Sequence, residues 1–136
     1  MAVKSGFKNS KKADKKSEVA RRLEETKKLL GIVPFVPQFL STRPDIFIPY
    51  HDLSLKVMLC PDHMDRKTSE LAAVAAGSAL ASEHCLNVHI EAAFNAGASK
   101  DEILESIMMG AFMSLTKSQS IALRKLEEIS IRRSKH

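Results

Sequence analysis

The sequence predicts an all-α protein. Apolar residues recur at helical spacing, or the composition favours helix, in almost every segment of the 136 residues. No segment shows the alternation of apolar and polar residues that is typical of a half-buried strand. Capping residues and glycines divide the chain into pieces of helical length. Together these observations indicate a bundle of helices joined by short connections.

The first predicted helix covers residues 17–30, because Ser17 is a candidate N-cap and Gly31 is a typical helix stop. The preceding residues, 1–16, hold six lysines and one aspartate, and so account for the whole net charge of +5. A lysine-rich segment without interleaved aromatic residues is typical of a solvated tail. We therefore expect a basic disordered tail over residues 1–16, and no nucleic-acid partner.

Prolines shape the next region. Three of them restrict residues 32–44 to turns or short pieces. A helix resumes over residues 44–59, where Pro49 predicts a kink. Residues 60–65, "CPDHMD", follow as a connector that begins with the first of the two cysteines.

Four more helices are expected in the second half of the chain. They cover residues 65–82, 82–97, 99–115 and 118–133. The alanine, glycine and methionine content of the central helices permits close packing. It also leaves apolar surface that one small domain does not cover, so we expect a homo-oligomer.

The stretch "SEHCLNVH" carries the candidate chemistry. Cys85 and His89 are four residues apart and lie on one face of the predicted helix. If Ser82 is the N-cap, Cys85 is the third helical residue, where free N–H groups and the helix dipole stabilise a thiolate. His89 can hold or shuttle a proton, and His84 can add positive potential or orient a substrate.

Glu70 is the candidate third member of this group. It is the only acid between positions 65 and 83, at the head of an otherwise apolar helix. A lone carboxylate there must be paired, capped or protonated. Facing His89, it can orient the imidazole or act as the base itself. A purely structural interpretation is also open, with the cysteine a core thiol, the histidine a packed side chain and the serine only a cap.

Residues 68–126 resemble the carboxymuconolactone decarboxylase family, and within it the AhpD-like alkylhydroperoxidase branch. That branch has a glutamate, an eleven-residue gap, and then Cys-x-x-Cys-x-x-x-His. Here Glu70 is followed by eleven residues and then by Ser82, Cys85 and His89 at the same spacing. The segment "HIEAAFNAGASKDEI" is also very similar to the family's sequence beyond the histidine.

The resemblance implies that Cys85 is the nucleophile toward a peroxide or a disulfide, with Glu70 and His89 as its proton relay. Ser82 departs from the pattern, because it stands where the resolving cysteine would be. Another thiol is then required, either Cys60, a small thiol or a partner protein. The resemblance also implies an oligomer, commonly a trimer or a hexamer.

We therefore predict an AhpD-like domain over residues 17–136, acting as a thiol-dependent peroxidase or disulfide reductase with an external thiol or protein reductant. Two alternatives stay open: a carboxymuconolactone decarboxylase-type lyase, which needs no redox cysteine, and a non-catalytic helical scaffold. We expect no cofactor and no metal. The absence of a signal peptide and of a long apolar run predicts a cytoplasmic protein without a membrane partner.

Overall fold

The computed structural model describes residues 3–135, with the backbone alone for residues 3–12. The regular structure within this range is all helical, which confirms the predicted fold class. The helices are α1 (Val3–Leu30), α2 (Phe35–Leu40), α3 (Pro44–Ser54), α4 (Arg66–Ala79), α5 (Glu83–Asn95) and α6 (Lys100–Ser134), and a π-helical turn, η1 (Leu55–Leu59), follows α3 directly.

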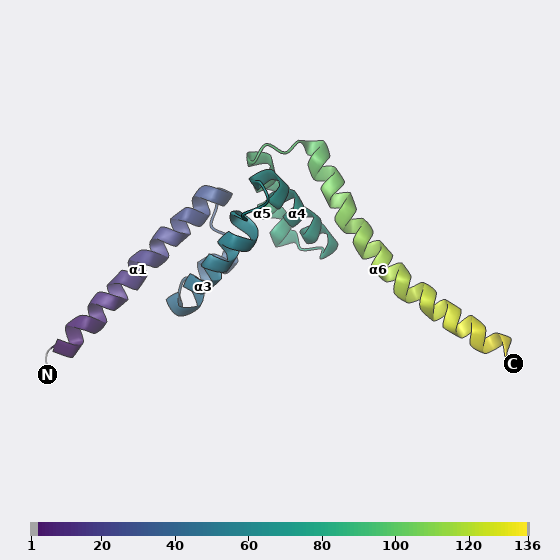
Figure 1. Ribbon diagram of the computed structural model, residues 1–136, viewed down its shortest axis with the longest axis horizontal. Coiled ribbons are helices and arrows are strands. Elements are labelled where there is room, and N and C mark those ends of the chain that lie inside the picture. The colour runs from purple at the N-terminus through teal and green to yellow at the C-terminus, as the bar shows by residue number, and fades with distance from the viewer. Residues whose placement is uncertain (1–2, 136) are drawn as a thin grey trace.

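The helices form an arch (Figure 1). α4 and α5 lie at its centre, while α1 and α6 run outward on opposite sides, so that the two ends of the chain are far apart. α4 packs against both α5 and α6, and α1 packs against α3 and α5. The centre of the arch is therefore the place where segments distant in sequence meet.

Local sequence explains most helix ends. Asp65 caps α4 by accepting a hydrogen bond from a backbone N–H, and Ser99 and Glu102 form a capping box at the start of α6. Gly31 and Gly97 follow α1 and α5 with φ of 78° and 88°, a conformation that strongly favours glycine. The predicted ends of these two helices are thus confirmed.

Two predicted boundaries are wrong. α1 begins at Val3 and passes through Ser17, because lysines are good helix formers and no proline interrupts them. The two helices expected over residues 99–133 are one continuous helix, α6. The polar residues between them include no glycine or proline, and Thr116 bonds back to the carbonyl of Met113 without breaking the helix. The division into a tail and a domain stays a prediction.

Small residues bring α4 and α6 into close contact. A Cβ atom on Gly110 would lie 2.0 Å from the carbonyl oxygen of Ala75, so no other residue fits there without displacing backbone. On either side of this contact, Ser78 donates to a carbonyl of α6 and Ser114 donates to a carbonyl of α4. These hydroxyl bonds and the missing Cβ fix the position of α4.

Buried apolar side chains form two clusters. One joins α1, η1 and α5, and the other joins α4, α5 and the start of α6. Their buried members are Leu30, Leu59, Val88 and Ala92 in the first, and Val74, Ala93, Ala98 and Ile103 in the second. α5 belongs to both, so its polar residues are held between two packed regions.

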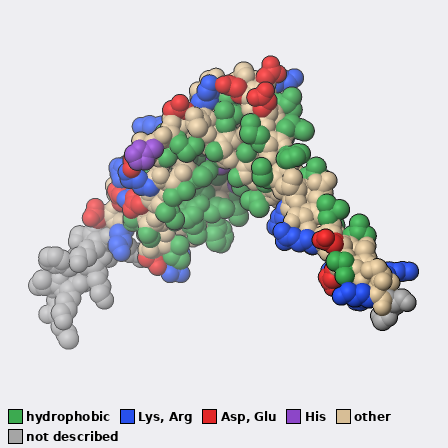
Figure 2. Space-filling model, turned by 45° about the vertical axis from the view of Figure 1, so that its right-hand side comes forward, with side chains coloured by type: hydrophobic (Ala, Val, Ile, Leu, Met, Phe, Trp, Pro, Cys, Tyr) green, Lys and Arg blue, Asp and Glu red, His purple; other side chains and the backbone are tan. Residues whose placement is uncertain are grey.

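α6 carries many exposed apolar side chains along its length, and Figure 2 shows apolar side chains gathered over the inner side of the arch. Within the described residues, even the long helices α1 and α6 lack an apolar stretch that would cross a bilayer.

Candidate functional site

Glu70 and His89 form a buried pair between α4 and α5. Nδ1 of His89 lies 2.7 Å from Oε2 of Glu70. The glutamate side chain is 1% exposed and the histidine side chain 15% exposed. Glu70 therefore faces His89, the condition under which it can orient the imidazole, and the role of the pair in catalysis stays a prediction.

Arg66 completes this pair, and the sequence analysis missed it. Its Nη2 atom lies 2.7 Å from Oε1 of Glu70, close enough for an ion pair but not aligned for a hydrogen bond. The guanidinium also donates to the carbonyls of Leu59 and Leu29, at 2.7 and 3.0 Å. Arg66 therefore ties α4 to η1 and α1 and places positive charge beside the buried carboxylate. The spacing of four residues between Arg66 and Glu70 was the available signal.

The pairing with Glu70 sets the hydrogen-bonding role of His89. A carboxylate only accepts hydrogen bonds, and its other oxygen, Oε1, lies against the guanidinium of Arg66. Nδ1 of His89 is then the donor, which leaves the lone pair on Nε2 of the neutral ring. A histidine held in this way can accept a proton at Nε2, and the carboxylate stabilises the resulting charge.

Cys85 is the third residue of α5, as predicted, and is half buried. His84 beside it is exposed. Helical side chains lean toward the N-terminal end, so His89 leans toward the turn that carries Cys85. Both residues line the same two hollows of the protein.

Ser82 occupies the N-cap position but its side chain makes no capping hydrogen bond, so the prediction of a serine cap is only half correct. Its ψ is 94°, whereas the capping residues Asp65 and Ser99 have ψ of 167° and 161°. The missing capping bond thus accompanies a different backbone angle. The N–H groups of the first turn of α5, including the one on Cys85, are not occupied by the serine.

The first hollow is a cavity of about 170 Å³ between α1, α2, α3, η1 and α5. Most of its wall is apolar, and its polar members include His51, Tyr50 and His84 together with Cys85 and His89. The second, of about 250 Å³, lies between η1, α4 and α5 and is lined mainly by small and apolar residues. Cys60 is exposed and lines neither hollow.

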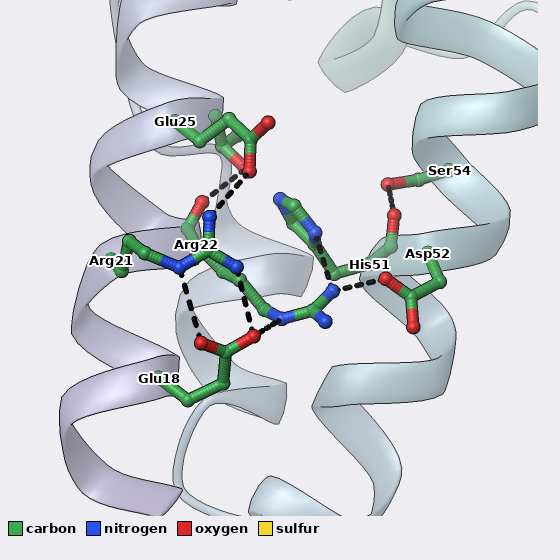
Figure 3. A network of polar contacts seen from close by, with 8 residues as sticks. Glu18, Arg21, Arg22, Glu25, His51, Asp52 and Ser54 are labelled. Atoms are coloured by element: carbon green, nitrogen blue, oxygen red, sulfur yellow. Dashed lines mark hydrogen bonds and ion pairs between the residues drawn. The ribbon is translucent and has the colours of Figure 1, made fainter. Parts of the chain in front are cut away.

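A second polar cluster borders the first cavity, between α1 and α3 (Figure 3). Arg22 of α1 contacts Glu18, His51 and Asp52. Hydrogen bonds from Arg21 and Arg22 lower the pKa of Glu18 to about 2. Burial, and then the charge of Arg22, lower the pKa of His51. The sequence analysis singled out none of these residues, because no motif joins α1 to α3.

Among known families, the carboxymuconolactone decarboxylase family model matches residues 44–128, more than half of the chain. The chain belongs to the carboxymuconolactone decarboxylase family. No curated protein and no solved structure matches it closely enough to count as a relative. The family match includes Glu70, Cys85 and His89, and also His51, but it excludes α1 and therefore Arg22.

Proposed function

We propose that the protein is a thiol-dependent oxidoreductase, a peroxidase or disulfide reductase of the AhpD-like type, with Cys85 as its nucleophile. The observation that carries the proposal is the buried Glu70–His89 pair, which shares two hollows with a half-buried cysteine in the first turn of a helix. An activated thiolate requires a base, an acid that orients the base, and helix N–H groups that stabilise negative charge, and the proposal assigns these parts to His89, Glu70 and the first turn of α5.

With a hydroperoxide, Nε2 of His89 accepts the thiol proton. The Cys85 thiolate attacks the terminal peroxide oxygen, so that a sulfur–oxygen bond forms as the oxygen–oxygen bond breaks. The leaving alkoxide takes the proton back from His89 and departs as an alcohol. Cys85 is oxidised to a sulfenic acid and the peroxide is reduced. Glu70 holds the ring of His89 throughout and stabilises its positive charge.

The sulfenic acid is cleared by thiols from outside the site. Ser82 has no sulfur, and Cys60 lines neither hollow beside Cys85. A first external thiol displaces water from the sulfenic acid and forms a mixed disulfide, and a second thiol attacks that disulfide and restores the Cys85 thiol. The second hollow, on the α4 side of Cys85, is where we place such a thiol.

A decarboxylase-type lyase is the second candidate, supported by the family match and by the histidines that line the apolar cavity. It needs the base His89 but no sulfur chemistry. It therefore predicts turnover of a lactone acid that survives replacement of both cysteines, which the thiol mechanism does not.

We propose further that the protein works as a homo-oligomer, a trimer or a hexamer, assembled through α6. Exposed apolar residues repeat along this helix at spacings of four and three residues: Met108, Phe112 and Leu115, then Ala122, Leu126 and Ile129. Such spacing is typical of a helix that packs against another helix. Light scattering should give a multiple of 15.1 kDa for the wild type, and a Phe112→Glu/Leu126→Glu chain should be monomeric.

The thiol proposal is tested by hydroperoxide consumption with dithiothreitol as the reductant. Cys85→Ser should abolish turnover, whereas Cys60→Ser, the matched control on the exposed cysteine, should retain it. Equal activity of the wild type and Cys85→Ser would overturn the proposal. Loss of activity in Cys60→Ser would instead identify Cys60 as the resolving thiol.

A further inference from the structure

A buried histidine, His51, lines the same cavity, and the proposed chemistry does not use it. His51 of α3 is 1% exposed, and its ring lies between α1 and α3 (Figure 3). Phe47, one turn earlier, packs against the ring at a centroid distance of 5.6 Å. Its Nδ1 atom lies 3.2 Å from Nη1 of Arg22. The ring is thus fixed both by packing and by a polar contact.

Arg22 determines which ring nitrogen of His51 carries the proton. A guanidinium group has only donors, so Nδ1 of His51 must be the acceptor. Burial and the charge of Arg22 lower the pKa of His51, which favours the neutral ring. A neutral imidazole that accepts at Nδ1 carries its hydrogen on Nε2. His51 therefore presents a fixed N–H donor at Nε2.

This donor makes no aligned hydrogen bond to the described residues, although the backbone carbonyl of Arg22 lies close enough to the ring to raise the pKa of His51. Nε2 of His51 is buried and makes no hydrogen bond to any of them. A buried donor without a partner costs roughly 1–3 kcal/mol, and such donors are rare in folded proteins. His51 is one of the residues that line the cavity beside Cys85, so a ligand held in that cavity is the partner that we assign to the donor.

The surroundings of His51 indicate an uncharged ligand. The charge on Arg22 is already paired with Glu18 at 2.6 Å and with Asp52. Glu25, the remaining acid that acts on His51, lies near Arg21 at 3.7 Å. The rest of the wall is mainly apolar, so a charged group in the cavity would lose its hydration without gaining a free counter-ion.

We propose that His51 is a ligand-binding residue whose Nε2–H group donates a hydrogen bond to the carbonyl oxygen of a small, uncharged, apolar molecule held beside Cys85. The donor fixes one end of the ligand, and the apolar wall formed by Leu30, Pro34, Met58 and Val88 covers its body. The proposal concerns what the cavity holds. It does not require Cys85 to react, so it can be tested independently of the thiol chemistry.

The test compares two probes of nearly the same shape, acetophenone and ethylbenzene, which differ in the carbonyl oxygen. Both are titrated into the full-length wild-type chain, with affinity measured by calorimetry and the ¹⁵N resonance of His51 Nε2 followed in parallel. Acetophenone should bind about ten-fold more tightly, because only its carbonyl oxygen accepts a hydrogen bond from the buried donor. It should also shift the Nε2 resonance, whereas ethylbenzene should not.

Variants assign the preference to His51. His51→Phe keeps a ring but removes the donor, so it should bind both probes equally, while His51→Gln restores an N–H donor and should recover part of the preference. His63→Phe, on an exposed histidine, should behave as wild type. Circular dichroism establishes that each variant is folded. Equal binding of the two probes to the wild type would overturn the proposal. An unchanged preference in His51→Phe, or an Nε2 resonance that does not shift when acetophenone is added, would overturn it too.

Discussion

His51 and His89, which line the first cavity, have opposite partners. Nδ1 of His89 faces a carboxylate, and Nδ1 of His51 faces a guanidinium. The first ring must donate at Nδ1 and keeps a lone pair on Nε2, whereas the second must accept at Nδ1 and carries its hydrogen on Nε2. The comparison teaches that the charge of one neighbour decides whether a buried histidine acts as a base or as a fixed donor.

The largest effect on turnover should come from removing the carboxylate charge that orients His89. Glu70→Gln removes the carboxylate charge while keeping the shape of the side chain. We expect hydroperoxide turnover to fall by roughly 10²–10³-fold, because His89 loses both its orientation and the stabilisation of its charge. Acetophenone binding, which depends on His51, should stay within about two-fold of the wild-type value. Steady-state kinetics and calorimetry on one protein sample check both, and a Glu70→Gln chain with wild-type turnover would remove His89 from the mechanism.

Gly110→Ala should destabilise α4 and α6, the region next to Glu70, more than α3, which carries His51. Its Cβ would lie 2.0 Å from the carbonyl of Ala75 on α4, so α4 and α6 must move apart, at a cost of about 3 kcal/mol in the free energy of unfolding. α4 carries Glu70, whereas His51 lies on α3, which packs against α1, α2 and η1. Urea unfolding should show the loss, and hydrogen exchange should rise in α4 and α6 more than in α3. Equal stability of Gly110→Ala and wild type would contradict the close contact.

Arg22→Met should remove the polar partner of Nδ1 of His51. Its effect on the free energy of unfolding should be smaller than that of Gly110→Ala. The methionine keeps much of the apolar stem but gives up the contacts with His51, Glu18 and Asp52. We expect a loss of about 1–2 kcal/mol in the free energy of unfolding, since the arginine side chain is mostly buried. Nδ1 of His51 then has no obligatory donor, so the preference for acetophenone should weaken. Cys85 turnover at saturating peroxide should be unchanged, and a turnover loss as large as that of Glu70→Gln would show that the two regions act as one.

The smallest effect should be a pH dependence of stability due to His51. Because its pKa is lower in the folded state than the ordinary value near 6.5, the unfolded chain takes up a proton first as the pH falls. Stability is therefore fully present above about pH 6.5 and is lost below it. Carboxyl groups with a lowered pKa, such as Glu18, also stabilise the fold, but that stability is lost only below about pH 4.5. Urea unfolding at pH 7.5 and 5.5 should thus show a smaller decrease for His51→Phe than for wild type, and an equal decrease would exclude this assignment.

The spacing of Glu70, Cys85 and His89 could be predicted from sequence because it lies within two consecutive helices and follows one pattern. Helical periodicity likewise sufficed for the fold class, and Gly31 and Gly97 for two helix ends. The His51–Arg22 contact could not be predicted in the same way. It joins residues 29 apart on helices whose packing depends on the whole core, and Arg22 lies outside the family match. Local rules also could not fix the ψ of Ser82, which decides whether its hydroxyl caps α5.

The central claim is that His51 and His89, which line one cavity, hold opposite tautomers. A long-range ¹H–¹⁵N correlation spectrum of the full-length protein, labelled at histidine nitrogens and recorded near pH 7.5, reads this directly. His89 should show a protonated Nδ1 and an unprotonated Nε2, and His51 the reverse. Glu70→Gln and Arg22→Met should each disturb only their own ring and so assign the signals. The same tautomer at both histidines, or a doubly protonated His51, would contradict the account.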